Sequence, residues 1–335
     1  MQESKKENLY TEEVNYINKK KIKRKKKSFC NCYDNVLILL IILLFVCFCY
    51  IIKIKYQQKI VYVENAENYQ PLETFDLNVL ESIQNNIKGI SELTQNEQKF
   101  FNGVLRKFKP KKVVEIGVSR GGTSTLILNA IKDIKGAKLY SIDKEKNFYK
   151  NPMKNTGFFV GKYFPDFMNN WELNVGGITS EFIEKIGGDI DLVMLDTVHL
   201  TPGEMLDWLQ VLPFLKEEAI VVLHDTFFMY YDEKVIKKKL NCPNNQLLTF
   251  IRGELILPSY GNSVFFRNIG ALKLDKDQKK YYKQYFLALG TQWEYMPEEK
   301  DLKIMREFFM KYYGEKCVEI FDDAVTKNKI HLNLY

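Results

Sequence analysis

Residues 111–128, KKVVEIGVSRGGTSTLIL, constrain the fold more than any other stretch of the chain. The β-branched, apolar start predicts a parallel strand that is covered on both faces, and a glycine ends it. Gly121 and Gly122 allow a tight turn in which the backbone comes close to a ligand. Thr123 and Ser124 are typical N-cap residues, and a helix that begins there has free N–H groups at its start. The pattern therefore predicts the strand, turn and helix of an α/β domain.

Glu115 is the unusual residue of this stretch, because its carboxylate lies at the mouth of an otherwise apolar strand. Burying a carboxylate is costly unless a ligand or a hydrogen-bond donor meets it. The residue therefore indicates a ligand site beside the turn. The plainer alternative is a capped strand-to-helix turn in an α/β domain of any function.

Strands and helices alternate after this turn. Further strands are predicted over residues 137–145, 171–178, 189–199 and 217–226, with helices over 179–186 and 202–215. Such alternation is typical of a doubly wound, mostly parallel, Rossmann-like sheet. Gly261-Asn262 is a hairpin signal, so residues 254–267 are expected to add an antiparallel C-terminal hairpin at the sheet edge. Residues 271–335 are expected to form a helical appendage that packs on the sheet or on a second subunit of a homo-oligomer.

The N-terminal end differs in composition from the rest of the chain. Residues 1–35 carry ten Lys/Arg against five Asp/Glu, so the remainder is close to neutral and gives no reason to expect nucleic-acid binding. Residues 36–52 carry no charge over 17 positions, which is about long enough to span a bilayer. We expect a basic cytoplasmic tail, one transmembrane helix, a stalk over 53–68 and a Rossmann-like domain over 69–270. Taken literally, the charge bias sends that domain out of the cytoplasm, but lysines also follow the span, so the side of the domain stays open.

Polar residues gather where the predicted parallel strands end. In open α/β sheets, ligands bind beyond the carboxyl ends of the strands. The residues expected at this edge are Glu115, Asp143, Asp196, His199, His224 and Asp225. Asp143 lies 22 residues beyond Gly121, close to the spacing at which an acid binds the ribose hydroxyls of a nucleoside-bearing ligand. The edge is therefore expected to hold a nucleoside site next to a group of acids and imidazoles.

Together, these residues resemble class I S-adenosylmethionine (SAM)-dependent methyltransferases over about residues 92–267. The resemblance is closest to the metal-dependent branch that includes the catechol and macrolide-sugar O-methyltransferases and related bacterial glycan-cluster proteins. The family pattern is acid-x-Gly-x-Gly-x-Gly; Glu115, Gly117 and Gly121 match it, while Ser119 stands at the middle glycine, as occurs in the metal-dependent branch. The resemblance implies that the cofactor contacts Glu115, Gly117, Ser119, Gly121, Gly122, Thr123, Asp143 and Thr179. Glu115 and the glycines would hold the methionine end, Asp143 the ribose, and Thr179 would lie near the adenine.

The same resemblance implies a metal site and a base at the ends of the fourth and fifth strands. Asp196, His224 and Asp225 take the ligand positions for a divalent cation, expected to be Mg²⁺, and His199 takes the position of the base. A divalent cation lowers the pKa of an acceptor hydroxyl, and a nearby imidazole can remove its proton. Related enzymes more often carry an acid at the position of His224, so a hydrogen-bonding role that orients Asp225 is the alternative for this residue.

The sequence thus predicts a membrane-anchored O-methyltransferase that acts on a hydroxyl of a saccharide or glycolipid. Two alternatives stay open: a non-catalytic, anchored glycan-binding or scaffold module on the same fold, and a hydroxylase-type relative that uses Fe²⁺ at the same acids. An NAD-dependent dehydrogenase is disfavoured, because the spacing Gly-x-x-x-Gly-Gly does not supply the cradle that a pyrophosphate needs.

Overall fold

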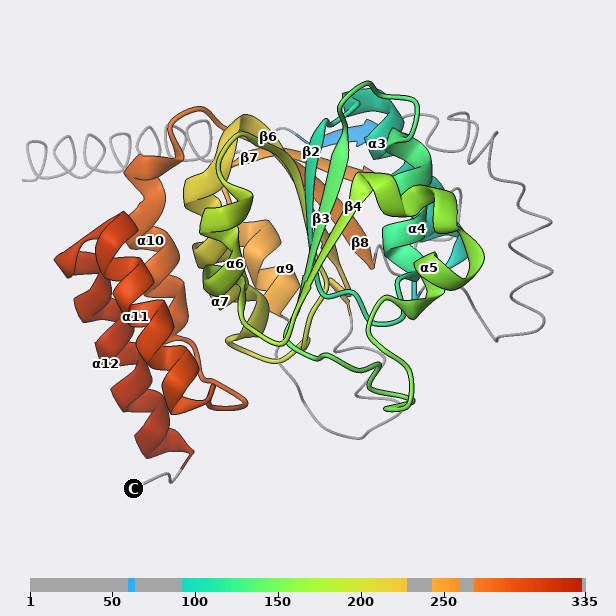
Figure 1. Cartoon of the computed structure of the whole chain (residues 1–335). Helices are drawn as coiled ribbons and strands as arrows, with labels where there is room; N and C mark the ends of the chain where they lie inside the picture. The colour runs from blue at the N-terminus through green and yellow to red at the C-terminus, as the bar shows by residue number, and fades with distance from the viewer. Residues whose placement is uncertain (1–59, 64–91, 228–242, 259–267, 333–335) are drawn as a thin grey trace, which may run out of the picture. The chain divides into compact units, whose positions relative to one another are not determined.

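A mixed sheet of eight strands lies at the centre of the described part of the chain, in the order β1-β7-β8-β6-β5-β2-β3-β4 (Figure 1). The strands are β1 (Ile60–Val63), β2 (Lys112–Ile116), β3 (Lys138–Asp143), β4 (Trp171–Val175), β5 (Ile190–Leu195), β6 (Leu215–His224), β7 (Gly253–Pro258) and β8 (Ile269–Leu274). Strands β4, β3, β2, β5 and β6 run parallel, β8 is antiparallel to both of its neighbours, and β1 runs parallel to β7. This computed structural model describes residues 60–63, 92–227, 243–258 and 268–332.

The parallel part of the sheet confirms the predicted alternation of strands and helices. β2 to β6 are the five strands expected from the sequence. Val114 and Ile116 of β2 join the core on one face of the sheet, whereas Val113 joins the core on the other. The chain proceeds from β2 to β3 and β4 on one side, and from β5 to β6 on the other. This reversal between β2 and β5 is the place where a ligand cleft is expected.

Helices cover both faces of the sheet (Figure 1). One face carries α3 (Gln95–Phe108), α4 (Gly122–Ile131), α5 (Phe158–Tyr163) and the 3-10 helix η1 (Pro165–Asn170). The other face carries α6 (Thr179–Ile186), α7 (Gly203–Val211), the 3-10 helix η2 (Leu212–Phe214), α9 (Pro243–Phe250) and the C-terminal helices. Each face buries its own apolar core, so the sheet is doubly wound as predicted.

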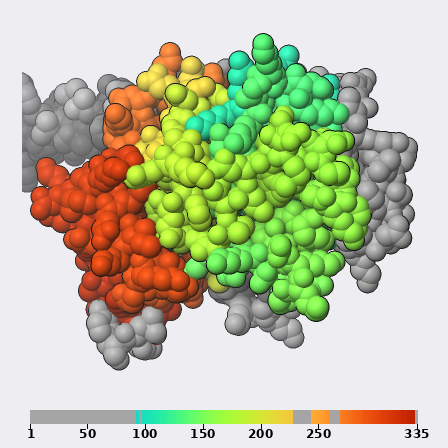
Figure 2. Space-filling view, viewed as in Figure 1, coloured from blue at the N-terminus to red at the C-terminus, as the bar shows by residue number. Residues whose placement is uncertain are grey.

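The C-terminal appendage consists of η3 (Gln278–Tyr281), α10 (Tyr282–Leu287), η4 (Ala288–Gly290), α11 (Glu299–Tyr313) and α12 (Glu315–His331). Figure 2 shows these helices, coloured orange to red, packed directly against the neighbouring surface. Trp293 and Phe309 are fully buried in the same core as Trp208 of α7. The carboxylate of Glu294 also accepts a hydrogen bond from the backbone of Thr201 (2.8 Å). The appendage thus shares the core on one face of the sheet.

Two boundaries differ from those expected. The antiparallel pair is present, but its second strand is Ile269–Leu274, which lies beyond the predicted hairpin of residues 254–267. Residues 259–267, which include the expected turn, lie outside the described residues. Ile60–Val63, expected within the stalk, forms the edge strand β1 and pairs with β7. Short apolar runs carry little information about their structure, so β1 has no distinctive sequence signal.

The predicted single-pass membrane localisation is contradicted. No helix in the described part of the chain is long and apolar enough to cross a membrane. Among those helices, α12 has the greatest length, 17 residues, and charged side chains occur along it. The apolar stretch over residues 36–52, the basic tail over 1–35 and most of the stalk lie outside the described residues.

Candidate active site

The glycine turn between β2 and α4 brings the ends of two strands into contact. Gly117 has φ +93°, and a Cβ atom on it would lie 1.8 Å from the carbonyl oxygen of Asp196, which follows β5. Ser119 has φ 53°, in the left-handed region where glycine is usual, in keeping with its place at the middle glycine of the motif. Gly121, with φ 94°, is the N-cap residue of α4, ahead of Thr123, where the sequence predicts the cap.

Glu115 lies behind this turn, inside the protein. Its Oε2 accepts hydrogen bonds from the hydroxyls of Ser124 (2.7 Å) and Ser141 (2.6 Å). Burial raises the pKa of Glu115 to about 8, although the two hydroxyls oppose this shift. The polar partners of this carboxylate are therefore two serines of the protein, and Glu115 does not line the cavity at the strand ends.

Asp143, at the end of β3, holds the turn from the other side. Its Oδ2 accepts hydrogen bonds from the backbone N–H groups of Val118 (2.9 Å) and Ser119 (3.1 Å). Its Oδ1 accepts a hydrogen bond from the N–H of Glu145 (2.8 Å). A carboxylate offers about four lone-pair sites, so Asp143 keeps accepting capacity for ligand hydroxyls.

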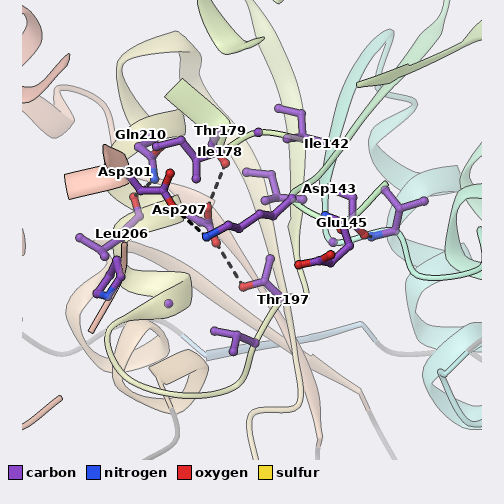
Figure 3. A pocket seen from close by; sticks show the side chains of 18 of the residues that line it. Ile142, Asp143, Glu145, Ile178, Thr179, Thr197, Leu206, Asp207, Gln210 and Asp301 are labelled. Atoms are coloured by element: carbon purple, nitrogen blue, oxygen red, sulfur yellow. Dashed lines mark hydrogen bonds and ion pairs between the residues drawn. The ribbon is translucent and has the colours of Figure 1, made fainter. Parts of the chain in front are cut away.

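A cavity of about 520 Å³ lies at the carboxyl edge of β2, β3 and β5 (Figure 3). This volume is within the range of about 300–1,000 Å³ that is usual for small-molecule sites. Four of the residues predicted to contact the cofactor line the cavity, namely Gly117, Ser119, Asp143 and Thr179, whereas Glu115, Gly121, Gly122 and Thr123 do not. Asp196 lines it as well. One cavity therefore joins the predicted nucleoside site to the predicted metal site.

The appendage contributes a wall of this cavity. Tyr295 and Met305 line it from the C-terminal side. Lys144, which follows Asp143, bonds through Nζ to Glu298 (2.8 Å) and Asp301 (2.7 Å). This role has no distinctive sequence signal, because aromatic and charged helices at a chain end are also typical of an outer packing layer.

Six ionisable residues form an acid–imidazole cluster beside the cavity: Glu97, Asp196, His199, Glu204, His224 and Asp225. His199 Nε2 lies 3.2 Å from Asp225 Oδ2 and 3.6 Å from Asp196 Oδ1. His199 Nδ1 lies 3.2 Å from Glu204 Oε1. His224 Nδ1 lies 3.0 Å from Asp196 Oδ1, and its Nε2 lies 3.7 Å from Glu97 Oε2. The cluster thus joins α3, α7 and the ends of β5 and β6.

The carboxylates of the cluster favour the protonated form of both imidazoles. Burial lowers the pKa of His199, but the hydrogen bond with Glu204 and the charges of nearby acids outweigh this effect and raise it to about 9. Burial likewise opposes a charge on His224, but its charge interaction and hydrogen bond with Asp196 raise its pKa well above the ordinary value. Burial raises the pKa of Asp225. The cluster is a site of concentrated negative charge.

The imidazole that lies with the two acids is that of His199, whereas the sequence predicts His224 as the metal ligand. Asp196, His199 and Asp225 each offer one ligand atom, and these atoms all lie within 4.8 Å of one another. His224 instead lies between Asp196 and Glu97. The two carboxylates suit Mg²⁺ or Mn²⁺, and the same carboxylates together with the imidazole suit Fe²⁺, so the residues present fit a divalent cation.

The backbone at this site is unusual as well. His199 has φ 57° and Asp225 has φ 51°, both in the left-handed region. The N–H of His199 donates a hydrogen bond to Glu204 Oε1 (2.8 Å), which holds the residue in this conformation. Such backbone conformations cost about 1–2 kcal/mol and are concentrated at functional sites.

Three acids of the site were not predicted from the sequence: Glu97, Glu204 and Asp207. Each lies on a helix, where acids usually face solvent. Thr94 and Glu97 form a capping box at the start of α3, which by itself accounts for a glutamate there. A signal did exist on α7, where Glu204 and Asp207 interrupt an otherwise apolar run. Acids on the buried face of such a helix indicate a site.

A comparison with protein families gives one match. Residues 114–226 match the family model described as a methyltransferase domain. The match confirms the resemblance to methyltransferases. The matched segment contains the glycine turn, Asp143, Asp196, His199 and Asp225, whereas Glu97 and the appendage lie outside it.

Several solved structures are similar to the chain. The O-methyltransferase TomG from Streptomyces achromogenes, involved in tomaymycin synthesis and solved with SAM, is 15% identical with a TM-score of 0.42, over 59% of this chain and 89% of that one. An O-methyltransferase from Bacillus cereus in complex with SAH is 10% identical with a TM-score of 0.42, over 62% of this chain and 99% of that one. A methyltransferase from Geobacter sulfurreducens is 15% identical with a TM-score of 0.41, over 59% of this chain and 88% of that one. No curated protein matches the chain.

Proposed function

We propose that the chain is a SAM-dependent O-methyltransferase that transfers a methyl group to a hydroxyl of its acceptor. One observation carries the proposal: a single cavity is lined both by Asp143 with the glycine turn and by Asp196 of the acid–imidazole cluster. A nucleoside bound at the turn would lie beside the group that must receive a hydroxyl proton. Methyl transfer needs alignment, proton removal and exclusion of water, and this arrangement serves all three.

Each part of the site has a role in this proposal. Gly117, Ser119 and Asp143 hold the ribose and methionine parts of the cofactor, and Thr179 lies near the adenine. Asp196 and Asp225 hold a divalent cation, which lowers the pKa of the acceptor hydroxyl when bound.

His199 would remove the proton of the acceptor hydroxyl in its neutral form, which a cation held by Asp196 and Asp225 would favour by compensating the charge of these two acids. Its Nδ1 is held by Glu204, so Nε2 is the nitrogen that faces Asp196 and Asp225. His224 orients Asp196 through a hydrogen bond of 3.0 Å. This assignment keeps His199 in the predicted role of base and moves His224 from metal ligand to positioning residue.

For the acceptor we propose a saccharide hydroxyl, and the support is the resemblance to the sugar O-methyltransferases. Transfer of labelled methyl groups from SAM to a panel of saccharides, with catechol as the comparison, tests this choice. Transfer to catechol alone would contradict it.

Calorimetry of the full chain with SAM and S-adenosylhomocysteine (SAH) tests the cofactor. We expect both to bind, and no heat at millimolar ligand would contradict the proposal. His199→Ala is expected to keep cofactor affinity while turnover falls roughly 10²- to 10⁴-fold. Unchanged turnover would remove His199 from the mechanism, and cofactor binding without turnover on any hydroxyl acceptor would favour a non-catalytic binding module.

A further inference from the structure

Asp207 of α7 is a half-buried ionisable residue that the proposed reaction does not use. It lines the cavity together with Thr179 and Thr197. Its Oδ1 accepts a hydrogen bond from the Thr179 hydroxyl (2.9 Å), and its Oδ2 accepts one from the Thr197 hydroxyl (3.1 Å). Figure 3 shows the carboxyl group between the two threonines. Two hydroxyls thus fix its orientation in the cavity wall.

These hydrogen bonds determine what the wall offers to a ligand. Both threonine hydroxyl hydrogens are donated to Asp207, so the threonine oxygens have only lone pairs left. Each carboxylate oxygen accepts one of these bonds and keeps capacity for another. The wall at Asp207 therefore presents a group of oxygens that accept hydrogen bonds, and it favours a ligand that donates them.

Two neighbouring polar side chains, Gln210 and Lys144, are used within the protein. Gln210 Oε1 accepts a hydrogen bond from the N–H of Ser180 (2.9 Å), and its Nε2 donates to the carbonyl of Leu206 (3.0 Å). The ammonium of Lys144 bonds to two acids of the appendage, Glu298 and Asp301. Neither Gln210 nor Lys144 therefore donates to Asp207, which lines the cavity.

Keeping an acid at this position is unfavourable for the fold. Burial raises the pKa of Asp207 to about 7, although the Thr179 hydroxyl opposes the shift. An apolar residue of similar size would avoid this desolvation, so a ligand contact gives a reason for the acid that packing does not.

We propose that Asp207 is a specificity-determining residue that accepts a hydrogen bond from the exocyclic amino group of adenine. This inference rests on the proposed function, because it places the adenine of SAM in the cavity beside Thr179. A base with an oxygen in place of the amino group would turn an acceptor toward the accepting wall. Sites built to bind one hydrogen-bonding group reject analogues that lack it.

Calorimetry with SAH and S-inosyl-L-homocysteine tests the inference, since the second ligand carries an oxygen where adenine has its amino group. Above the pKa of Asp207 of about 7, where its carboxyl is ionised, the unmodified chain is expected to bind SAH roughly 10- to 100-fold more tightly, the range for a hydrogen bond to a charged group. Asp207→Asn exchanges one accepting oxygen for a donor with little change of shape, so this ratio is expected to collapse. Asp207→Ser, a smaller side chain, is expected to do the same and serves if the asparagine variant does not fold.

Asp322→Asn is the matched control, because Asp322 forms an exposed ion pair with Arg306 between α11 and α12. It is expected to keep the ratio of the unmodified chain. Equal affinity of the unmodified chain for the two ligands, or an unchanged ratio in both Asp207 variants, overturns the inference while the proposed function stands. No binding of SAH by the unmodified chain overturns both.

Discussion

The glycine turn and the acid–imidazole cluster border the same cavity but satisfy their polar atoms in opposite ways. At the turn, backbone N–H groups donate to both oxygens of Asp143, and two serine hydroxyls donate to Glu115. In the cluster, four carboxylates surround two imidazoles. The carboxylates of the turn are held by donors of the protein, whereas the cluster carries surplus negative charge.

This difference shows what each half of the site, the glycine turn and the acid–imidazole cluster, needs from a ligand. A hydrogen-bonded network that is already formed keeps its shape, so the turn is preorganised for a cofactor. Surplus carboxylates are stabilised by positive charge, so a cation is expected to stabilise the cluster when it binds. Substitutions in the turn should therefore act mainly on the fold, and substitutions in the cluster mainly on cation binding.

Gly117→Ala is expected to have the largest effect, because the two halves touch at this residue. The new Cβ atom would lie 1.8 Å from the carbonyl oxygen of Asp196 on a backbone with φ +93°. We expect the free energy of unfolding to fall by on the order of 3 kcal/mol or more, and cofactor binding to be lost with it. Urea denaturation and calorimetry with SAH measure the two effects.

Gly136→Ala is the matched control for this substitution. Gly136 has φ +77°, and nothing lies within 4 Å of the position of an added Cβ atom. Backbone strain alone should cost about 1–2 kcal/mol, with SAH affinity unchanged. Equal losses in the two alanine variants would show that the contact between Gly117 and Asp196 does not link the two halves.

Asp225→Asn tests the charge of the cluster directly. We expect Mg²⁺ or Mn²⁺ to raise the free energy of unfolding of the unmodified chain, by about 2.7 kcal/mol at 100 times the dissociation constant. Asp225→Asn removes one of the grouped ligand atoms, so this gain should largely disappear. Asp143→Asn, in the turn, should destabilise the chain without the cation yet keep the gain. If Asp143→Asn lost the stabilisation by the cation and Asp225→Asn kept it, the assignment of cation binding to the cluster would be refuted.

The sequence predicts the turn more completely than the cluster, and the reason is physical. The turn is one continuous stretch whose glycines and β-branched residues are local signals, and Asp143 follows at a recognisable spacing. The cluster draws Glu97 and Glu204 from helices, where burial depends on packing that a single sequence does not display. The roles of the two histidines depend on side-chain direction, which the strand-end positions of His199 and His224 leave open.

Glu115→Gln tests whether the buried acid of the turn governs its stability. The pKa of Glu115 is about 8 in the folded chain against an ordinary value of 4.5. Between these values the unfolded chain has released a proton that the folded chain keeps. The free energy of unfolding of the unmodified chain should therefore fall as the pH rises, by about 1.4 kcal/mol per pH unit from this group.

Glutamine keeps an oxygen for Ser124 and Ser141 but does not titrate. The free energy of unfolding of the Glu115→Gln variant should therefore fall less across this pH range than that of the unmodified chain, as measured by urea denaturation. Asp207 titrates in both proteins, so its contribution cancels when their pH profiles are subtracted. Parallel pH profiles would show that Glu115 is ionised in the folded chain.

The smallest effect is expected at Lys144, which connects the turn side of the cavity to the appendage. The side chain of its partner Asp301 is only 4% exposed, against 55% for Glu298. Lys144→Met leaves the Asp301 carboxylate buried without its cation, so the free energy of unfolding should fall by about 1–2 kcal/mol. Lys327→Met removes an exposed pair with Asp323 and should cause no measurable loss. Equal results would mean that apolar packing alone, around residues such as Trp293 and Phe309, holds the appendage wall against the cavity.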